Sequence, residues 1–261
     1  MNKLTKQMNQ AALEIYAGDS VQRVGRPTLK ALRDRNLLGV DNKLTDFGKR
    51  YAISRMPLAK QCSEMSLEYE TVKLPYEGKP EQALLAYYRS LDYIGISTEG
   101  IGILTVLKSL MLDKLAQYNS FNDRADACTR HIEAQLTILK DKAEEIIMSI
   151  PSVSKKRYIN NFHEIISDPF IASEYPELSM EFAIAMYDAV NTDVYIAVAR
   201  KVAEDPYTYR NGWPDLTLIK KDEVLFIEVK TDDKLHESQL ITIPTMRDIM
   251  SFPFRVCRIT K

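Results

Sequence analysis

The segment NGWPDLTLIKKDEVLFIEVK, residues 211–230, carries charged side chains at positions where a strand that only packs a core has no use for them. Asp215 opens one apolar run, and Glu228 and Lys230 lie inside the next, where period-two alternation puts them on one face. If the turn KKDE pairs the two runs, the carboxylates meet, and their repulsion raises the pKa of one. A divalent cation such as Mg²⁺ or Mn²⁺ relieves that conflict, and the ammonium can orient or activate water. The pattern predicts metal-assisted hydrolysis of a phosphodiester.

The spacing P-D-x(12)-E-x-K, which begins at Pro214, is the signature of the PD-(D/E)xK nuclease superfamily. The flanking segments RNGWPDL and FIEVKTDDKLHESQ resemble the virus-type replication-repair nuclease (VRR-NUC) domain, whose E-V-K strand is followed by a D-x-L-x-x-x-Q segment. Asp233, Leu235 and Gln239 match that segment. Thr231 and Asp232 stand where many members have Gly-Pro, which implies a different loop after the strand.

The segment YYRSLDYIGISTEGIGILTVLKSLMLD resembles the start of the nuclease domain in Fanconi-associated nucleases. Glu99 matches their metal-binding glutamate, and STEG places it near a helix N-terminus, where the helix dipole favours an acid. Glu177, expected on one helix with Glu174 and Glu181, is the reserve candidate if Glu99 binds no metal.

The resemblance implies a site made by few groups. Glu99, Asp215, Glu228 and the backbone carbonyl of Val229 would hold one or two Mg²⁺ or Mn²⁺ ions. Lys230 would position or activate the attacking water. The same four side chains, Glu99, Asp215, Glu228 and Lys230, are the expected catalytic residues.

Charge divides the chain unevenly. Residues 1–60 hold 12 Lys and Arg against 5 Asp and Glu, whereas the whole chain has a net charge of −1. The stretch from Val24 resembles the recognition helix and wing of winged-helix domains, so Lys30, Arg33 and Arg35 would face DNA. A soluble basic surface, or a winged helix that only packs, is the alternative.

Two residues near the motif are further candidates for DNA contact. Arg210 could hold a substrate phosphate, with a plain surface charge as the alternative. Gln239 could touch the site or the DNA, with a plain helix-face glutamine as the alternative.

Apolar periodicity outlines the elements. Helices are expected at residues 5–17, from Pro27, after Asp46, on both sides of GISTEGIG, and over 122–149, 157–167, 177–203 and 237–249. Strands are expected at 215–220, 224–230 and 254–259. These elements and the resemblance predict an α/β fold, a PD-(D/E)xK core with a mixed sheet flanked by helices. The expected domains are a winged-helix-like DNA-binding domain at 1–72 and a nuclease domain at 80–261, with a helical insertion at about 115–205.

Three widely spaced cysteines argue against a disulfide framework, and no signal-peptide core or membrane span is visible, so a cytoplasmic protein, nucleoid-associated if bacterial, is expected. By resemblance, the substrates are flapped or branched duplexes met in repair or replication. Two alternatives stay open: a DNA-binding regulatory or scaffold protein with a non-catalytic nuclease fold, and a defence or restriction nuclease.

Overall fold

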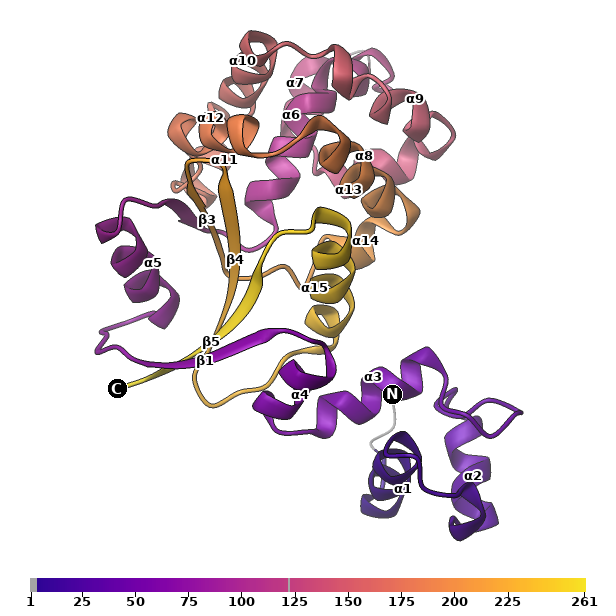
Figure 1. Cartoon of the computed structure of the whole chain (residues 1–261). Coiled ribbons are helices and arrows are strands. Elements are labelled where there is room, and N and C mark those ends of the chain that lie inside the picture. Colours follow the sequence, from indigo (N-terminus) through magenta and orange to yellow (C-terminus); the bar gives the residue numbers. More distant parts are fainter. Residues whose placement is uncertain (1–3, 122) are drawn as a thin grey trace.

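A mixed sheet forms the centre of the molecule (Figure 1), in a computed structural model that describes residues 4–121 and 123–261. Within the described residues the strands form one five-stranded sheet in the order β1-β5-β4-β3-β2. The strands are β1 Glu68–Lys73, β2 Ile94–Ser97, β3 Leu216–Lys220, β4 Glu223–Lys230 and β5 Phe254–Thr260. β5 pairs in parallel with β1 and β4, and β3 pairs antiparallel with β4 and β2. The predicted α/β fold class is confirmed.

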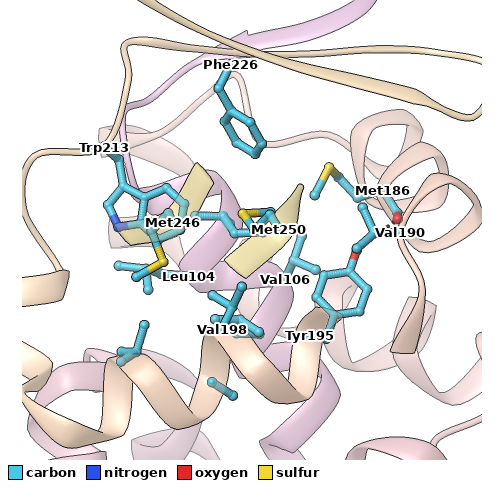
Figure 2. Close-up of a cluster of buried hydrophobic side chains, with 14 of the residues drawn as sticks. Leu104, Val106, Met186, Val190, Tyr195, Val198, Trp213, Phe226, Met246 and Met250 are labelled. Carbon is cyan, nitrogen blue, oxygen red and sulfur yellow. Dashed lines mark hydrogen bonds between the residues drawn. The ribbon is translucent and has the colours of Figure 1, made fainter. Parts of the chain in front are cut away.

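Helices cover both faces of this sheet, which is why its inner strands read as nearly continuous apolar runs. One face of β4 packs Leu225, Ile227 and Val229 towards α5 (Pro80–Ser90). The opposite face carries Phe226, which joins the larger core formed with the other helices. In Figure 2, Trp213 and Phe226 lie above Met246 and Met250, and their ring centroids are 6.3 Å apart.

The larger core is built by helices on the side of the sheet away from α5 (Figure 1). They are α6 Ile101–Gln117, α8 Ile132–Ile138, α9 Ala143–Ile147, α10 Lys155–Ile166, α11 Pro169–Glu174, α12 Met180–Ala189, α13 Thr192–Glu204, α14 Pro206–Tyr209 and α15 Glu237–Met250, with 3-10 turns at Lys140–Lys142 and Ile150–Ser152. α7 Arg124–Thr129 contributes Ala127 and Cys128 to a smaller cluster instead. None of the helices described is both long and apolar enough to cross a membrane.

The long helix expected over 122–149 is wrong. The chain turns at Arg130, whose backbone is extended, and α7 and α8 are separate. The buried Gln135 amide donates hydrogen bonds to the carbonyls of Ala127 (2.9 Å) and Arg130 (2.8 Å). A buried side chain thus satisfies backbone acceptors that a continuous helix would have paired internally.

The single helix expected over 177–203 is also wrong. α12 ends before Val190, and Asn191 caps α13 by accepting a hydrogen bond from the Asp193 N–H. Glu177 precedes α12 in a turn, so it does not share one helix with Glu174 and Glu181.

The basic N-terminal part has its own small apolar cluster, which includes Met8, Leu32, Leu38, Leu44 and Ala52. Its elements are α1 Lys6–Tyr16, a 3-10 turn at Val21–Arg23, α2 Arg26–Arg33 and α3 Asp46–Arg55, with an isolated bridge between Leu38 and Leu44. We call residues 4–55 the N-terminal module. Its description as a winged helix stays a prediction.

The sheet begins before the predicted start of the nuclease domain at residue 80. α4 (Leu58–Glu64) packs in the larger core through Leu58 and Cys62, and β1 pairs with β5 along its whole length. The domain division at 72 and 80 was drawn without these two elements, which connect the N-terminal module directly to the sheet (Figure 1).

Candidate active site

The β3–β4 hairpin brings Asp215 and Glu228 together. Its turn is Lys221–Asp222, and the last regular pair is Leu216 opposite Ile227. Just beyond that pair, Asp215 Oδ2 accepts a hydrogen bond from the Val229 N–H at 2.8 Å. The motif aspartate therefore takes the place of a backbone acceptor where strand pairing stops.

Glu228 lies at the centre of a buried polar cluster. Its side chain is 1% exposed, and Oε1 is 2.9 Å from Lys230 Nζ and 2.6 Å from Gln239 Nε2. Lys230 Nζ also contacts Asp233 Oδ2 at 3.1 Å. Glu228 and Lys230 thus share one face of β4, as the alternation predicted, and Gln239 contacts the site carboxylate.

Burial disfavours the charges of both motif acids. It raises the pKa of Asp215 to about 6, although the Val229 N–H and Lys230 act in the opposite direction. Burial and then the charge of Asp215 raise the pKa of Glu228 to about 8. Burial opposes the charge of Lys230 as well, but the Glu228 carboxylate outweighs it and raises the pKa of the ammonium. The two acids therefore form a site that favours an added positive charge.

Glu99 reaches the site from the turn between β2 and α6. Its φ is +49°, and Gly100 follows as the residue before α6. A Cβ on Gly100 would lie 2.5 Å from Trp213 Cδ1, so only glycine lets this turn pack against the segment that leads to Asp215. The negative charge of Glu99 contributes to the raised pKa of Asp215.

A cleft of about 480 Å³ opens at Glu99 and Asp215. Its charged lining is mostly acidic, with Glu81, Glu99, Glu133, Glu174, Glu177 and Asp215 against Lys79 and Arg210. Glu177 is engaged in structural bonds, because its two oxygens accept hydrogen bonds from Gln82 Nε2 and the Ser97 N–H, both at 2.7 Å.

Arg210 lies in this cleft, held by a residue that the sequence did not single out. Its Nη1 is 2.8 Å from Glu133 Oε1, and the Glu133 side chain is only 5% exposed whereas that of Arg210 is 43% exposed. A buried carboxylate on α8 thus orients a half-exposed guanidinium. Nothing in the spacing of α8 marked Glu133.

Gln239 is positioned by a glycine and by a helix cap. Gly212 has φ +77°, and a Cβ there would lie 2.3 Å from the Ser238 carbonyl carbon. The start of α15 therefore packs directly against the chain before the motif. Gln239 Oε1 accepts the His236 N–H at 2.9 Å, which leaves its amide group to donate to Glu228.

The donor set fits a hard divalent cation. Glu228 Oε2 is buried and accepts no hydrogen bond from any described residue, and Asp215 lies beside it. Among residues 4–121 and 123–261, no three His, Cys, Asp or Glu side chains are already gathered closely enough to hold a metal.

The other predicted DNA-binding residues lie on the N-terminal module, away from the cleft. Lys30 and Arg33 are exposed on α2. Arg33 donates to Asn42 Oδ1, and Arg35 is half-buried with Nη1 donating to the Ala31 carbonyl at 3.0 Å. Lys30 and Arg33 are therefore the more available cations.

The sequence of residues 154–260 matches the VRR-NUC domain family. This segment carries Asp215, Glu228, Lys230 and Gln239, and it excludes Glu99. The predicted resemblance to the VRR-NUC domain is confirmed for residues 154–260. No curated protein matches the chain.

Solved structures extend the likeness beyond the matched segment. Crystal structures of paFAN1 bound to DNA with a gap and a 5′ flap of two or one nucleotides match with TM-scores of 0.60 and 0.59, at 15% identity. They cover 97% and 98% of this chain, which spans only 51% and 52% of theirs. At this identity the likeness establishes the fold, and at that level it confirms the predicted resemblance to Fanconi-associated nucleases.

Proposed function

We propose that this VRR-NUC protein is a Mg²⁺- or Mn²⁺-dependent DNA nuclease that hydrolyses phosphodiester bonds. The observation that carries the proposal is that Asp215 lies next to the buried Glu228, whose Oε2 accepts no hydrogen bond from the described chain. Two adjacent acids with raised pKa values are a costly arrangement unless a cation joins them.

Asp215, Glu228, Glu99 and the carbonyl of Val229 are the groups that would hold the metal. When bound, the cation would polarise the scissile phosphate and offset its developing charge. Lys230 is fixed between Glu228 and Asp233, so its ammonium is oriented without any change of rotamer. From there it would position the attacking water and stabilise negative charge on phosphate oxygens.

The acidic lining of the cleft favours this proposal over a module that only grips DNA. Six acids face two cations there, so a phosphate would be repelled unless bound metal reversed the local charge. The N-terminal module would supply the affinity for DNA, through contacts of Lys30 and Arg33 with phosphates.

Flapped duplex is the first substrate class to test, because paFAN1 was crystallised with 5′-flap DNA. A role in repair or replication belongs to the same proposal. End-labelled single-stranded, duplex, 5′-flap and 3′-flap DNA would each be incubated with EDTA, Mg²⁺ or Mn²⁺. We expect metal-dependent products that Asp215→Ala abolishes. Binding without products from any substrate would refute the nuclease.

A further inference from the structure

The segment between β4 and α15, residues 231–236, contacts the active site at both ends and the N-terminal part of the chain in its middle. We call it the linking loop. At its start, Asp233 Oδ2 contacts the Lys230 ammonium at 3.1 Å. At its end, the His236 N–H donates to Gln239, whose amide donates to Glu228.

The middle of the linking loop is held by Gln61 of α4. Gln61 is fully buried, and its Oε1 accepts the Leu235 N–H at 3.0 Å. Its Nε2 donates to the carbonyl of Ile53 in α3 at 3.1 Å. One side chain therefore bonds the last turn of the N-terminal module to the loop that supports Lys230.

A second contact runs parallel to the first. Lys234 Nζ donates to the carbonyl of Arg55, the last residue of α3, at 2.9 Å. Helix α15 also packs against α3. The N-terminal module is thus fixed to the same loop and helix that position Lys230 and Gln239.

We propose that Gln61 is a positioning residue for the active site, through which the seating of the N-terminal module sets the order of the linking loop. A buried amide that leaves neither oxygen nor nitrogen unbonded specifies one arrangement of three segments. Without this amide, the Leu235 N–H loses its buried acceptor. The linking loop would then no longer hold Asp233 against Lys230 and His236 against Gln239. The N-terminal module then contributes to turnover as well as to DNA binding. Only the expected effect on the rate of DNA cleavage rests on the proposed function.

The test compares Gln61→Met with Gln135→Met in the full chain. Methionine keeps the volume and removes the amide. Gln135 is a matched control because it is also buried, and its Nε2 bonds two backbone carbonyls that are outside the linking loop. Three quantities are measured: hydrogen exchange of residues 231–236, Mn²⁺ affinity by calorimetry, and kcat and KM on flap DNA.

We expect Gln61→Met to accelerate exchange in the linking loop and to lower Mn²⁺ affinity and kcat by about tenfold each, with KM nearly unchanged, since supporting residues around metal sites typically contribute 10- to 100-fold. Gln135→Met should lower thermal stability without these effects. Lys234→Met, an exposed change, should accelerate loop exchange to a smaller extent and keeps the test valid if Gln61→Met does not fold.

Unchanged loop exchange in folded Gln61→Met would overturn the proposal, as would equal losses of kcat in the two glutamine variants. Hydrogen exchange separates this outcome from failure of the nuclease proposal, because it reports on the loop even if the wild-type protein cleaves nothing.

Discussion

The carboxylate of Asp215 lies 2.8 Å from the backbone nitrogen of Val229 and accepts its hydrogen bond. An acid of the nuclease motif thus closes the β3–β4 hairpin where regular pairing has ended. Its structural role requires an oxygen acceptor, whereas its proposed catalytic role requires a negative charge. The two roles can be separated by substitution.

Asp215→Asn should keep the fold and lose the chemistry. The asparagine oxygen can accept the Val229 N–H, and removing a charge that burial disfavours should leave the melting temperature in EDTA equal or higher. Mn²⁺ affinity and metal-dependent cleavage should be lost. Asp215→Ala, the control, should lose cleavage and also some stability because it removes the acceptor. Cleavage by Asp215→Asn at the wild-type rate would contradict the site assignment.

Lys230→Met should slow cleavage by about 10²- to 10⁴-fold, the usual contribution of one positioned acid–base or electrostatic group. It should also destabilise the protein, because Glu228 would keep its buried position without its cation.

A double-mutant cycle separates these two effects of Lys230. In the Glu228→Gln background, Lys230→Met should cost less stability in EDTA than it does alone, since no buried carboxylate remains to be compensated. Additive losses of unfolding free energy would show that the contact between the two side chains contributes nothing.

In metal-free buffer, stability should fall as pH rises from about 6 to about 8, above the range in which carboxyl groups with lowered pKa values, such as Asp113, titrate. The pKa of Asp215 is raised to about 6 and that of Glu228 to about 8, so the native state binds more protons than the unfolded state in this window. Chemical denaturation at several pH values, with EDTA present, measures the slope.

The matched variant for this pH dependence is Glu228→Gln, which should flatten the slope above pH 6. Mn²⁺ should raise the melting temperature of the wild type more at pH 8 than at pH 5, because protons compete with the cation for the carboxylates. A wild-type slope that Glu228→Gln leaves unchanged would assign the titration to other groups.

The motif hairpin could be predicted from the sequence because it depends only on residues that are close together in the chain. The two acids are separated by one short turn, and alternation fixes which side chains share a face of β4. Gln239 was recognisable for a similar reason, since it follows within one loop and the first turn of α15.

The elements that were missed depend on distant partners. β1 lies at the edge of the sheet, where it pairs with β5, and many of its residues are charged and exposed. β2 is four residues long and contains Gly95. Neither segment therefore shows the apolar pattern of a strand. The break between α7 and α8 is stabilised by the buried Gln135, and Arg210 is held by Glu133. Such contacts form only when the chain has folded, so the periodicity of apolar residues in the sequence does not predict them.

Lys30→Glu and Arg33→Glu should weaken DNA binding and lower its salt dependence. Each neutralised phosphate contributes close to one unit to the slope of log K against log salt, so losing one contact should reduce the slope by about one. These substitutions are preferable to deletion of residues 1–60, which would remove Gln61's partner Ile53 and the core residue Leu58.

The control for the N-terminal charges is Lys140→Glu, an exposed change in the 3-10 turn before α9. It alters net charge equally but lies in the helical part of the chain. Equal loss of affinity from Lys140→Glu and Lys30→Glu would mean that the N-terminal module binds no DNA.

Glu99→Gln and Glu177→Gln should differ in kind, although both residues line the cleft. Glu177 accepts hydrogen bonds from Gln82 and from the Ser97 N–H, so its loss should lower the melting temperature and leave Mn²⁺ affinity nearly intact. Glu99 is exposed on its turn and its charge acts on Asp215, so its loss should weaken Mn²⁺ binding and slow cleavage with little effect on stability. Calorimetry measures the Mn²⁺ affinity of both variants, and thermal melts measure their stability. The opposite pattern would make Glu177 the third metal ligand and would give Glu99 no part in the site.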